Sequence, residues 1–395
     1  MLLHRFARRG LVLALGVLLL PACEPYMSMT DQVPSQTRRA AALLPETPQY
    51  VGMVDVETAL RQVEALNGMR LADSLRQVDN PFLHSFLDAT ELDLRTDVQA
   101  VYGALEGEET ISAVVFGALT ADQMDRYLEA APAGAGRATT YRGAPLYHLA
   151  LGPTSPDADT LRVAFVDDGT IAVARSADPV TAMVDRHRAG NGGLRSNEDY
   201  MALVERVGRG STAWIAGRNV VETALQDEAE APSAEEAEER KMTQAGLQGA
   251  LAEWSDRVLG LSEVSGLEKG FEGRAGDRFG RLARQLREQA VSVRLTDTAL
   301  EGQAYLTMRD EESAGSVVDV AEGAVAVLRL SQEELDERHR SLLDGVEVDR
   351  NGAIVRVRFS LDRGLLRDQF SDGEAPRAVR RADPSIRPVT TTLRR

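Results

Sequence analysis

A strand–turn–strand unit followed by a helix recurs along the chain, and this pattern restricts what the chain can fold into. In the first example, residues 98–105 and 110–119 are rich in β-branched and apolar side chains and flank the turn residues 106–109. Thr120 and Gln123 then have the spacing of a capping box that begins a helix. Adjacent strands joined by short turns pair antiparallel, so the unit predicts a β-hairpin with a helix packed on it.

Three further hairpins follow the same pattern. Strands predicted at 161–166 and 170–174 flank Asp167-Asp168-Gly169, and strands at 346–349 and 353–361 flank Asn351-Gly352. Asp-Gly and Asn-Gly favour tight hairpin turns because glycine accepts positive φ. A third pair, 291–295 and 300–308, is joined at Thr296-Asp297. The predicted fold class is therefore α+β, with antiparallel sheet and helices packed on it.

A short repeated sequence indicates two similar halves. Residues 56–60 read VETAL, as do residues 221–225, and each copy lies where a predicted strand passes into a helix. We interpret this as an internal duplication, with a first α+β half at 41–209 and a second at 210–370. Whether the halves share one sheet or form two domains stays open at this stage.

The N-terminus has the features of a bacterial lipoprotein signal. Arg5, Arg8 and Arg9 precede the apolar run LVLALGVLLL at 11–20, which is too short to cross a bilayer but suits a signal peptide. Leu20-Pro21-Ala22-Cys23 then resembles a lipobox, and Cys23 is the only cysteine. We predict a signal peptide at 1–22, lipid on Cys23, and a flexible tether at 23–40. The lipid would anchor the protein to a membrane rather than span it.

Charge limits the partners of the chain. The formal net charge is −16, and the signal segment holds three arginines and no acid, so the mature chain is more acidic still. An acidic body repels phosphate backbones, which argues against nucleic acid as a partner. Residues 226–239 form an acidic insertion with no basic residue, and residues 371–395 predict a disordered basic tail.

Two segments carry a resemblance to a known group of proteins. The first is Leu44-Pro45 followed by the strand Tyr50-Val51-Gly52-Met53-Val54-Asp55. The second is Leu194-Arg195-Ser196 with Tyr200-Met201-Ala202-Leu203 and then the strand Thr212-Ala213-Trp214-Ile215. The chain resembles a family of uncharacterised secreted and lipid-anchored bacterial proteins. The resemblance implies a duplicated α+β body and implies no activity.

No motif predicts catalysis, a cofactor or a metal. His84, His148, His187 and His339 lie on different predicted elements, without the spacing of metal ligands. No GxSxG elbow is present, and lipid would occupy the only thiol. The closest approach to a metal motif begins at Glu347, but Arg358 stands where a calcium loop needs a bidentate glutamate. The alternating apolar residues after Asn351 predict a hairpin there instead.

These observations favour a non-enzymatic binding or scaffolding module of the cell envelope. Its expected contacts are the membrane, through Cys23, and an envelope protein, without any cofactor. The alternative is a carrier or sensor for an apolar envelope molecule, and an enzyme of unrecognised type is a third hypothesis. Glu24 follows the cysteine where an aspartate commonly marks inner-membrane retention. We therefore predict outer-membrane placement facing the periplasm.

Overall fold

The computed structural model describes residues 33–67, 81–107, 110–131, 135–150, 160–218, 282, 285–330 and 344–364. The predicted signal peptide, Cys23, residues 23–32 of the predicted tether, the acidic insertion, His339 and the basic tail lie outside these residues. The helices are α2 (Ser35–Leu43), α3 (Val56–Asn67), α5 (Pro81–Thr90), α6 (Ala121–Ala130), α7 (Ala177–Ala189), the short 3-10 helix η2 (Leu194–Ser196), α8 (Glu198–Val207) and α13 (Glu311–Leu330). The strands are β1 (Tyr50–Asp55), β2 (Val98–Glu106), β3 (Thr110–Gly117), β4 (Gly136–Tyr141), β5 (Ala144–Ala150), β6 (Thr160–Asp167), β7 (Thr170–Ala174), β8 (Ala213–Arg218), β9 (Leu286–Leu295), β10 (Ala299–Met308), β11 (Glu347–Asn351) and β12 (Ile354–Asp362).

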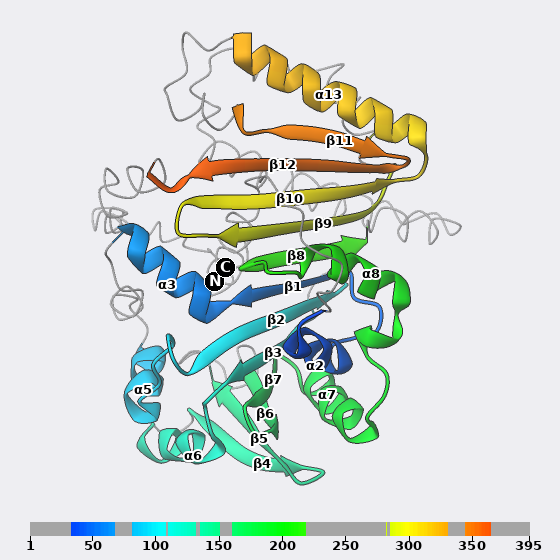
Figure 1. Cartoon of the computed structure of the whole chain (residues 1–395). Coiled ribbons are helices and arrows are strands. Elements are labelled where there is room, and N and C mark those ends of the chain that lie inside the picture. Colours follow the sequence, from blue (N-terminus) through cyan, green and yellow to red (C-terminus); the bar gives the residue numbers. More distant parts are fainter. Residues whose placement is uncertain are drawn as a thin grey trace, which may run out of the picture.

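All of these strands form one antiparallel sheet, which confirms the predicted α+β class (Figure 1). The order is β11-β12-β10-β9-β8-β1-β2-β3-β7-β6-β5-β4. Outward from the central β1–β8 pair, the order β1-β2-β3-β7-β6 on one side matches β8-β9-β10-β12-β11 on the other. The two halves therefore share a single sheet, and the first half adds the hairpin β4–β5 at its outer edge.

The turns explain several of the strand pairings. Gly169 has φ +76° between β6 and β7, and Gly352 has φ +58° between β11 and β12. Glycine adopts these angles without steric cost, so the Asp-Gly and Asn-Gly predictions are confirmed. The capping box of α6 is also confirmed, because the Thr120 hydroxyl accepts from the Gln123 backbone N–H while the Gln123 side chain accepts from Thr120 N–H.

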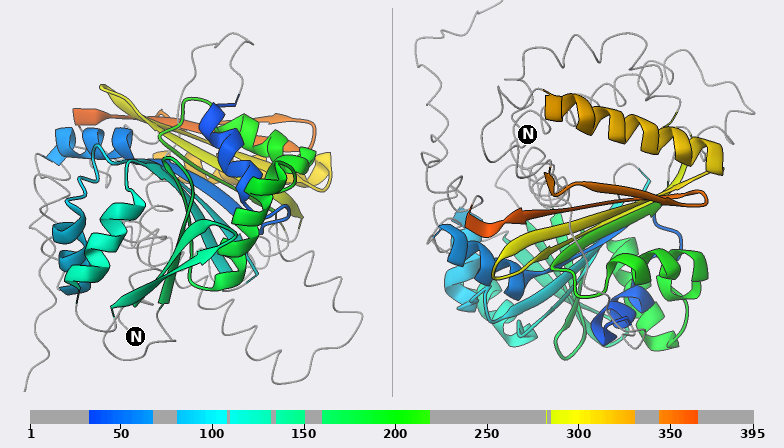
Figure 2. Two further views of the ribbon diagram at one scale, coloured as in Figure 1. Left: turned by 90° about the horizontal axis from the view of Figure 1, so that it is seen from below. Right: turned by 45° about the horizontal axis from the view of Figure 1, so that its top comes forward.

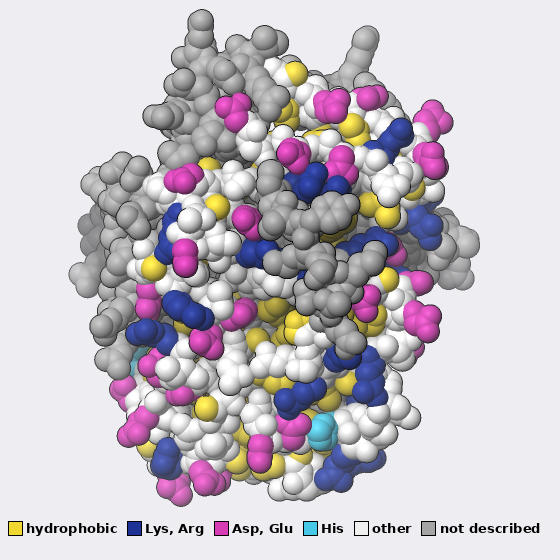
Figure 3. All heavy atoms as spheres, in the orientation of Figure 1, with side chains coloured by type: hydrophobic (Ala, Val, Ile, Leu, Met, Phe, Trp, Pro, Cys, Tyr) yellow, Lys and Arg dark blue, Asp and Glu magenta, His cyan; other side chains and the backbone are white. Residues whose placement is uncertain are grey.

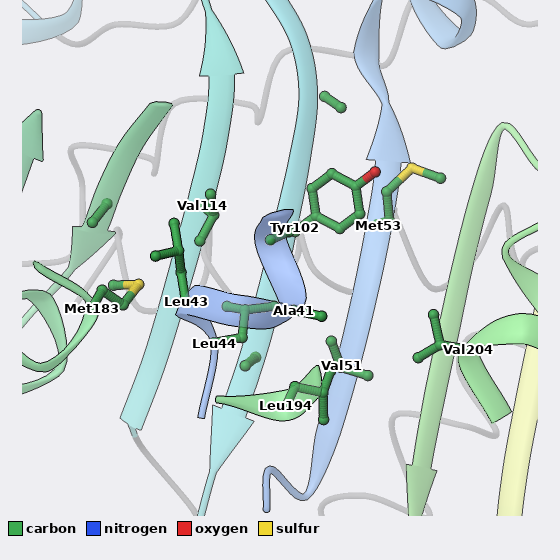
Figure 4. Packing of buried hydrophobic residues seen from close by; sticks show 14 of the residues in the cluster. Ala41, Leu43, Leu44, Val51, Met53, Tyr102, Val114, Met183, Leu194 and Val204 are labelled. Atoms are coloured by element: carbon green, nitrogen blue, oxygen red, sulfur yellow. The ribbon is translucent and has the colours of Figure 1, made fainter. Parts of the chain in front are cut away.

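One face of the sheet is covered by α2, α7, η2 and α8. Leu43 at the end of α2 and Leu44 directly after it lie over Val51 and Val114 of the strands (Figure 4). The end of α2 is held where Leu194 N–H donates to the Leu44 carbonyl. Gly193 permits this approach, because a Cβ there would lie 2.5 Å from the Ala42 carbonyl oxygen. Burying each aliphatic side chain in this core contributes about 1.5–3 kcal/mol.

The opposite face has separate clusters along its length. Side chains alternate along a strand, so Val114 and Phe116 of β3 enter the first core while Val115 points to the other face. There α6 places Met124 and Tyr127 over β5, β6 and β7. At the far end α13 packs on β10, β11 and β12. Figure 2 shows α5 and α6 on the other side of the sheet from α2, α7 and α8.

One expectation needs correction, and one hairpin was not predicted. The predicted tether at 23–40 extends too far, because α2 begins at Ser35, and Thr37 and Ala40 are buried. Because these buried side chains are small, and not large and apolar, the sequence did not predict that this segment is part of the core. The hairpin β4–β5 was missed because β4, GRATTY, is exposed on both faces and shows no alternation. Asn197 caps α8, and its side chain accepts from Tyr200 N–H.

Candidate functional site

The histidines singled out in the sequence are not brought together. His84 lies on α5, His148 on β5 and His187 on α7, while His339 is outside the described residues. In the part of the chain that the structure describes, no three His, Cys, Asp or Glu side chains are grouped as metal ligands. His84, His148 and His187 therefore lie in three separate environments.

A cleft of about 400 Å³ lies at the C-terminal end of α7. Its lining comes from the turn between β4 and β5, from the end of β6, and from the last turns of α7. The lining residues are Gly143, Ala144, Pro145, Phe165, Val166, Val184, His187 and Arg188. Ala144 and Val166 pack with Val184 of α7 there, whereas the Phe165 side chain packs against Tyr147 on the opposite face of the sheet. The polar side chains in the lining are His187 and Arg188.

Asp185 of α7 holds the β4–β5 turn in place beside this cleft. Its Oδ2 accepts from the Tyr141 hydroxyl at 3.1 Å, and its Oδ1 forms an ion pair with Arg142 Nε at 3.2 Å. Arg142 has φ +48° and Gly143 has φ +82°, so both central residues of the turn are left-handed. A non-glycine residue in that region costs about 1–2 kcal/mol, which these contacts help to offset.

A second carboxylate fixes the other side of the cleft. Arg39 Nη2 of α2 donates to Asp167 Oδ1 at 3.1 Å and to Thr170 Oγ1 at 2.6 Å. His187 Nδ1 lies 3.9 Å from Asp167 Oδ2, which is longer than a hydrogen bond. Asp167 thereby joins α2 to the β6–β7 turn.

Arg188 and His187 are the basic side chains that line the cleft. Arg142 and Arg39 lie in neighbouring segments and are paired with Asp185 and Asp167. Figure 3 shows basic side chains and a histidine gathered over α7. Val166 and Val184 are the larger apolar side chains of the lining on the face of the sheet that α7 covers. This arrangement can bind the anionic group of a ligand or partner that also has an apolar part.

Sequence reasoning missed this cleft because its walls come from distant segments. His187 was noted only as a residue on the face of a helix, and Arg142-Gly143 is not among the turn dipeptides that stand out in a sequence. The available signal was a cluster of bases, Arg186-His187-Arg188, in the last turn of α7.

The weak calcium motif is a hairpin, as the alternation predicted. Asp349 of β11 pairs with Arg356 at 2.9 Å and with Arg358 at 3.1 Å. Arg358 also pairs with Glu347 at 3.0 Å. The arginines of β12 thus neutralise the carboxylates that a calcium ion would need. Among the described helices, none is both long and apolar enough to cross a membrane.

Comparison with known proteins finds little similarity. No protein-family model matches the chain, and no curated protein matches it. Solved structures of TP0453 in crystal forms III, I and IV match 84% of this chain and 97%, 96% and 96% of theirs. Their TM-scores are 0.40, 0.37 and 0.38, with 8%, 8% and 9% sequence identity. Agreement at this level is too low for any functional property to be transferred.

Proposed function

We propose that this protein is a lipid-anchored binding or scaffolding module of the bacterial cell envelope. The observation that carries the proposal is the lipobox, with the only cysteine of the chain directly after Leu20-Pro21-Ala22. The packed body supports it, because Val33 is already buried ten residues after Cys23. Ten extended residues span at most about 36 Å, so the body would stay close to the membrane surface.

Binding without catalysis is the role we propose for this body. The cleft beside α7 is lined by His187 and Arg188, which suits recognition of an anionic group on an envelope protein. We place the protein at the outer membrane, facing the periplasm, because Glu24 rather than aspartate follows Cys23. The matching strand order of the two halves supports an internal duplication as the origin of the fold.

A second candidate function is a carrier or sensor for an apolar envelope molecule. The volume of the cleft, about 400 Å³, falls within the range of about 300–1,000 Å³ that is common for ligand sites. Val166 and Val184, on the face of the sheet that α7 covers, would contact the apolar part of such a ligand. Its polar end would then meet Arg188.

Cell fractionation tests the anchor directly. The native chain should sediment with the outer membrane, and Cys23→Ala should move to the soluble periplasmic or uncleaved precursor fraction, since the thiol that receives lipid is gone. Cys23→Ser, a closely matched variant, should behave in the same way. Sedimentation of both variants with the outer membrane, as for the native chain, would contradict the proposal.

A further inference from the structure

Three basic side chains lie side by side across the outermost strands of the first half. Arg137 of β4 is the cross-strand partner of His148 of β5, and His148 is the partner of Arg162 of β6. Directly paired residues point to the same face of a sheet, so the three form one row. The outer strands are roughly 10 Å apart, which lets the two long arginine side chains meet over the histidine. None of these residues lines the cleft beside α7.

Hydrogen bonds hold the His148 ring in one tautomer. Thr139 Oγ1 donates to the Leu146 carbonyl at 3.1 Å, so its remaining role is to accept from His148 Nε2 at 3.2 Å. His148 Nδ1 then accepts from Arg162 Nη1, with which it is in direct contact. The ring is therefore neutral, with its proton on Nε2, and it orients the Arg162 guanidinium.

The row has no counter-charge among the described residues. The charges that act on His148 are Arg162 and Arg137, and these arginines add to burial in lowering the pKa of the ring. Arg162 Nε is buried without a hydrogen-bond partner in the described part of the chain. Arg137 and Arg162 flank the neutral His148 from the two neighbouring strands, so an anion bound between them would offset the repulsion of their positive charges.

We propose that Arg137 and Arg162 form a binding site for a phosphate group above His148. Guanidinium groups bind tetrahedral oxyanions through two parallel N–H···O bonds, and two long arginine side chains on either side of β5 can share one phosphate. The hydrogen-bonded side chains of Thr139 and His148 orient the Arg162 guanidinium before phosphate binds. The phosphate could come from a free phosphate ion or from a phospholipid headgroup, which present the same oxygens.

The test is NMR of the mature chain from Cys23, with 15N-labelled histidine, in a non-ionic detergent. Inorganic phosphate is titrated at constant ionic strength against chloride, and phosphatidylglycerol vesicles are added separately in phosphate-free buffer. We expect saturable shifts of the His148 ring nitrogens that chloride does not cause. Saturation by inorganic phosphate identifies the free ion as sufficient, whereas saturation by vesicles alone identifies the lipid headgroup, and each supports the site.

Variants separate the site from general charge effects. Arg162→Gln should weaken phosphate binding about tenfold, since one charged hydrogen-bonding group is lost. Arg137→Gln, at an exposed position where folding is not at risk, should weaken it similarly. Arg126→Gln on α6 is the matched control and should bind as the native chain does. Equal shifts in phosphate and chloride, or native affinity in both Arg137→Gln and Arg162→Gln, would overturn the proposal.

Discussion

Replacing Asp185 with alanine should release the β4–β5 hairpin from α7. The Tyr141 hydroxyl loses a carboxylate acceptor, and hydrogen bonds to charged groups are worth about 1.5–3 kcal/mol. The Asp185 side chain is 39% exposed, which reduces this to about 1 kcal/mol. The ion pair with Arg142, itself 58% exposed, adds about 0–1 kcal/mol. We therefore expect a local loss of about 1–2 kcal/mol.

Hydrogen exchange followed by mass spectrometry measures this loss where it occurs. A loss of 1–2 kcal/mol accelerates exchange by about 5–30-fold in peptides from β4 and β5, if these amides open locally. Peptides from β9 and β10, on the other half of the sheet, should exchange as before. Those peptides serve as the internal control.

A double-mutant cycle identifies the contact that is responsible. Tyr141→Phe alone should accelerate exchange in β4 and β5 by an amount that corresponds to about 1 kcal/mol, and combining it with Asp185→Ala should add little further. Fully additive effects of the two substitutions, or unchanged exchange in Asp185→Ala, would refute the idea that Asp185 fixes this wall of the cleft.

The remaining predictions concern His148, Trp214 and Thr120. The lowered pKa of His148 means that the unfolded chain takes up a proton first as pH falls, so stability is retained above about pH 6.5 and decreases as pH falls through the folded pKa. His148→Gln should remove that part of the pH dependence in urea unfolding, and an unchanged profile would contradict it. Trp214→Ala should cost about 3–5 kcal/mol in the same assay, because its side chain is 1% exposed at the centre of the sheet. Thr120→Ala should cost about 1 kcal/mol through loss of the α6 cap, and a loss below about 0.3 kcal/mol would argue against the cap.

The hairpins that carry strong turn residues were predictable from sequence. Asp168-Gly169 and Asn351-Gly352 identify their turns because glycine is needed where φ is positive. The Thr120–Gln123 cap was predictable for a similar reason, since two side chains satisfy two backbone groups within four residues. These signals depend only on residues close together in the sequence, so they can be recognised without knowledge of the fold.

Features that depend on distant neighbours were not predictable. The helix α2 is buried through Thr37 and Ala40, whose types do not mark a core position. The exposed strand β4 has no apolar alternation, and it exists because β5 pairs with it. Asp185 and Asp167 gain their roles only when α7 and α2 lie beside the β4–β5 and β6–β7 turns. The single shared sheet likewise follows from the pairing of β1 with β8, which are far apart in the chain.

The mass of the mature protein tests the central claim most directly. The lipoprotein is extracted in mild detergent, and its mass is measured after denaturation. We predict a chain that begins at Cys23 and exceeds its calculated mass by an acyl-sized increment, which Cys23→Ala should lack. An unmodified chain, or one that retains residues 1–22, would contradict the lipid anchor on which the proposed function rests.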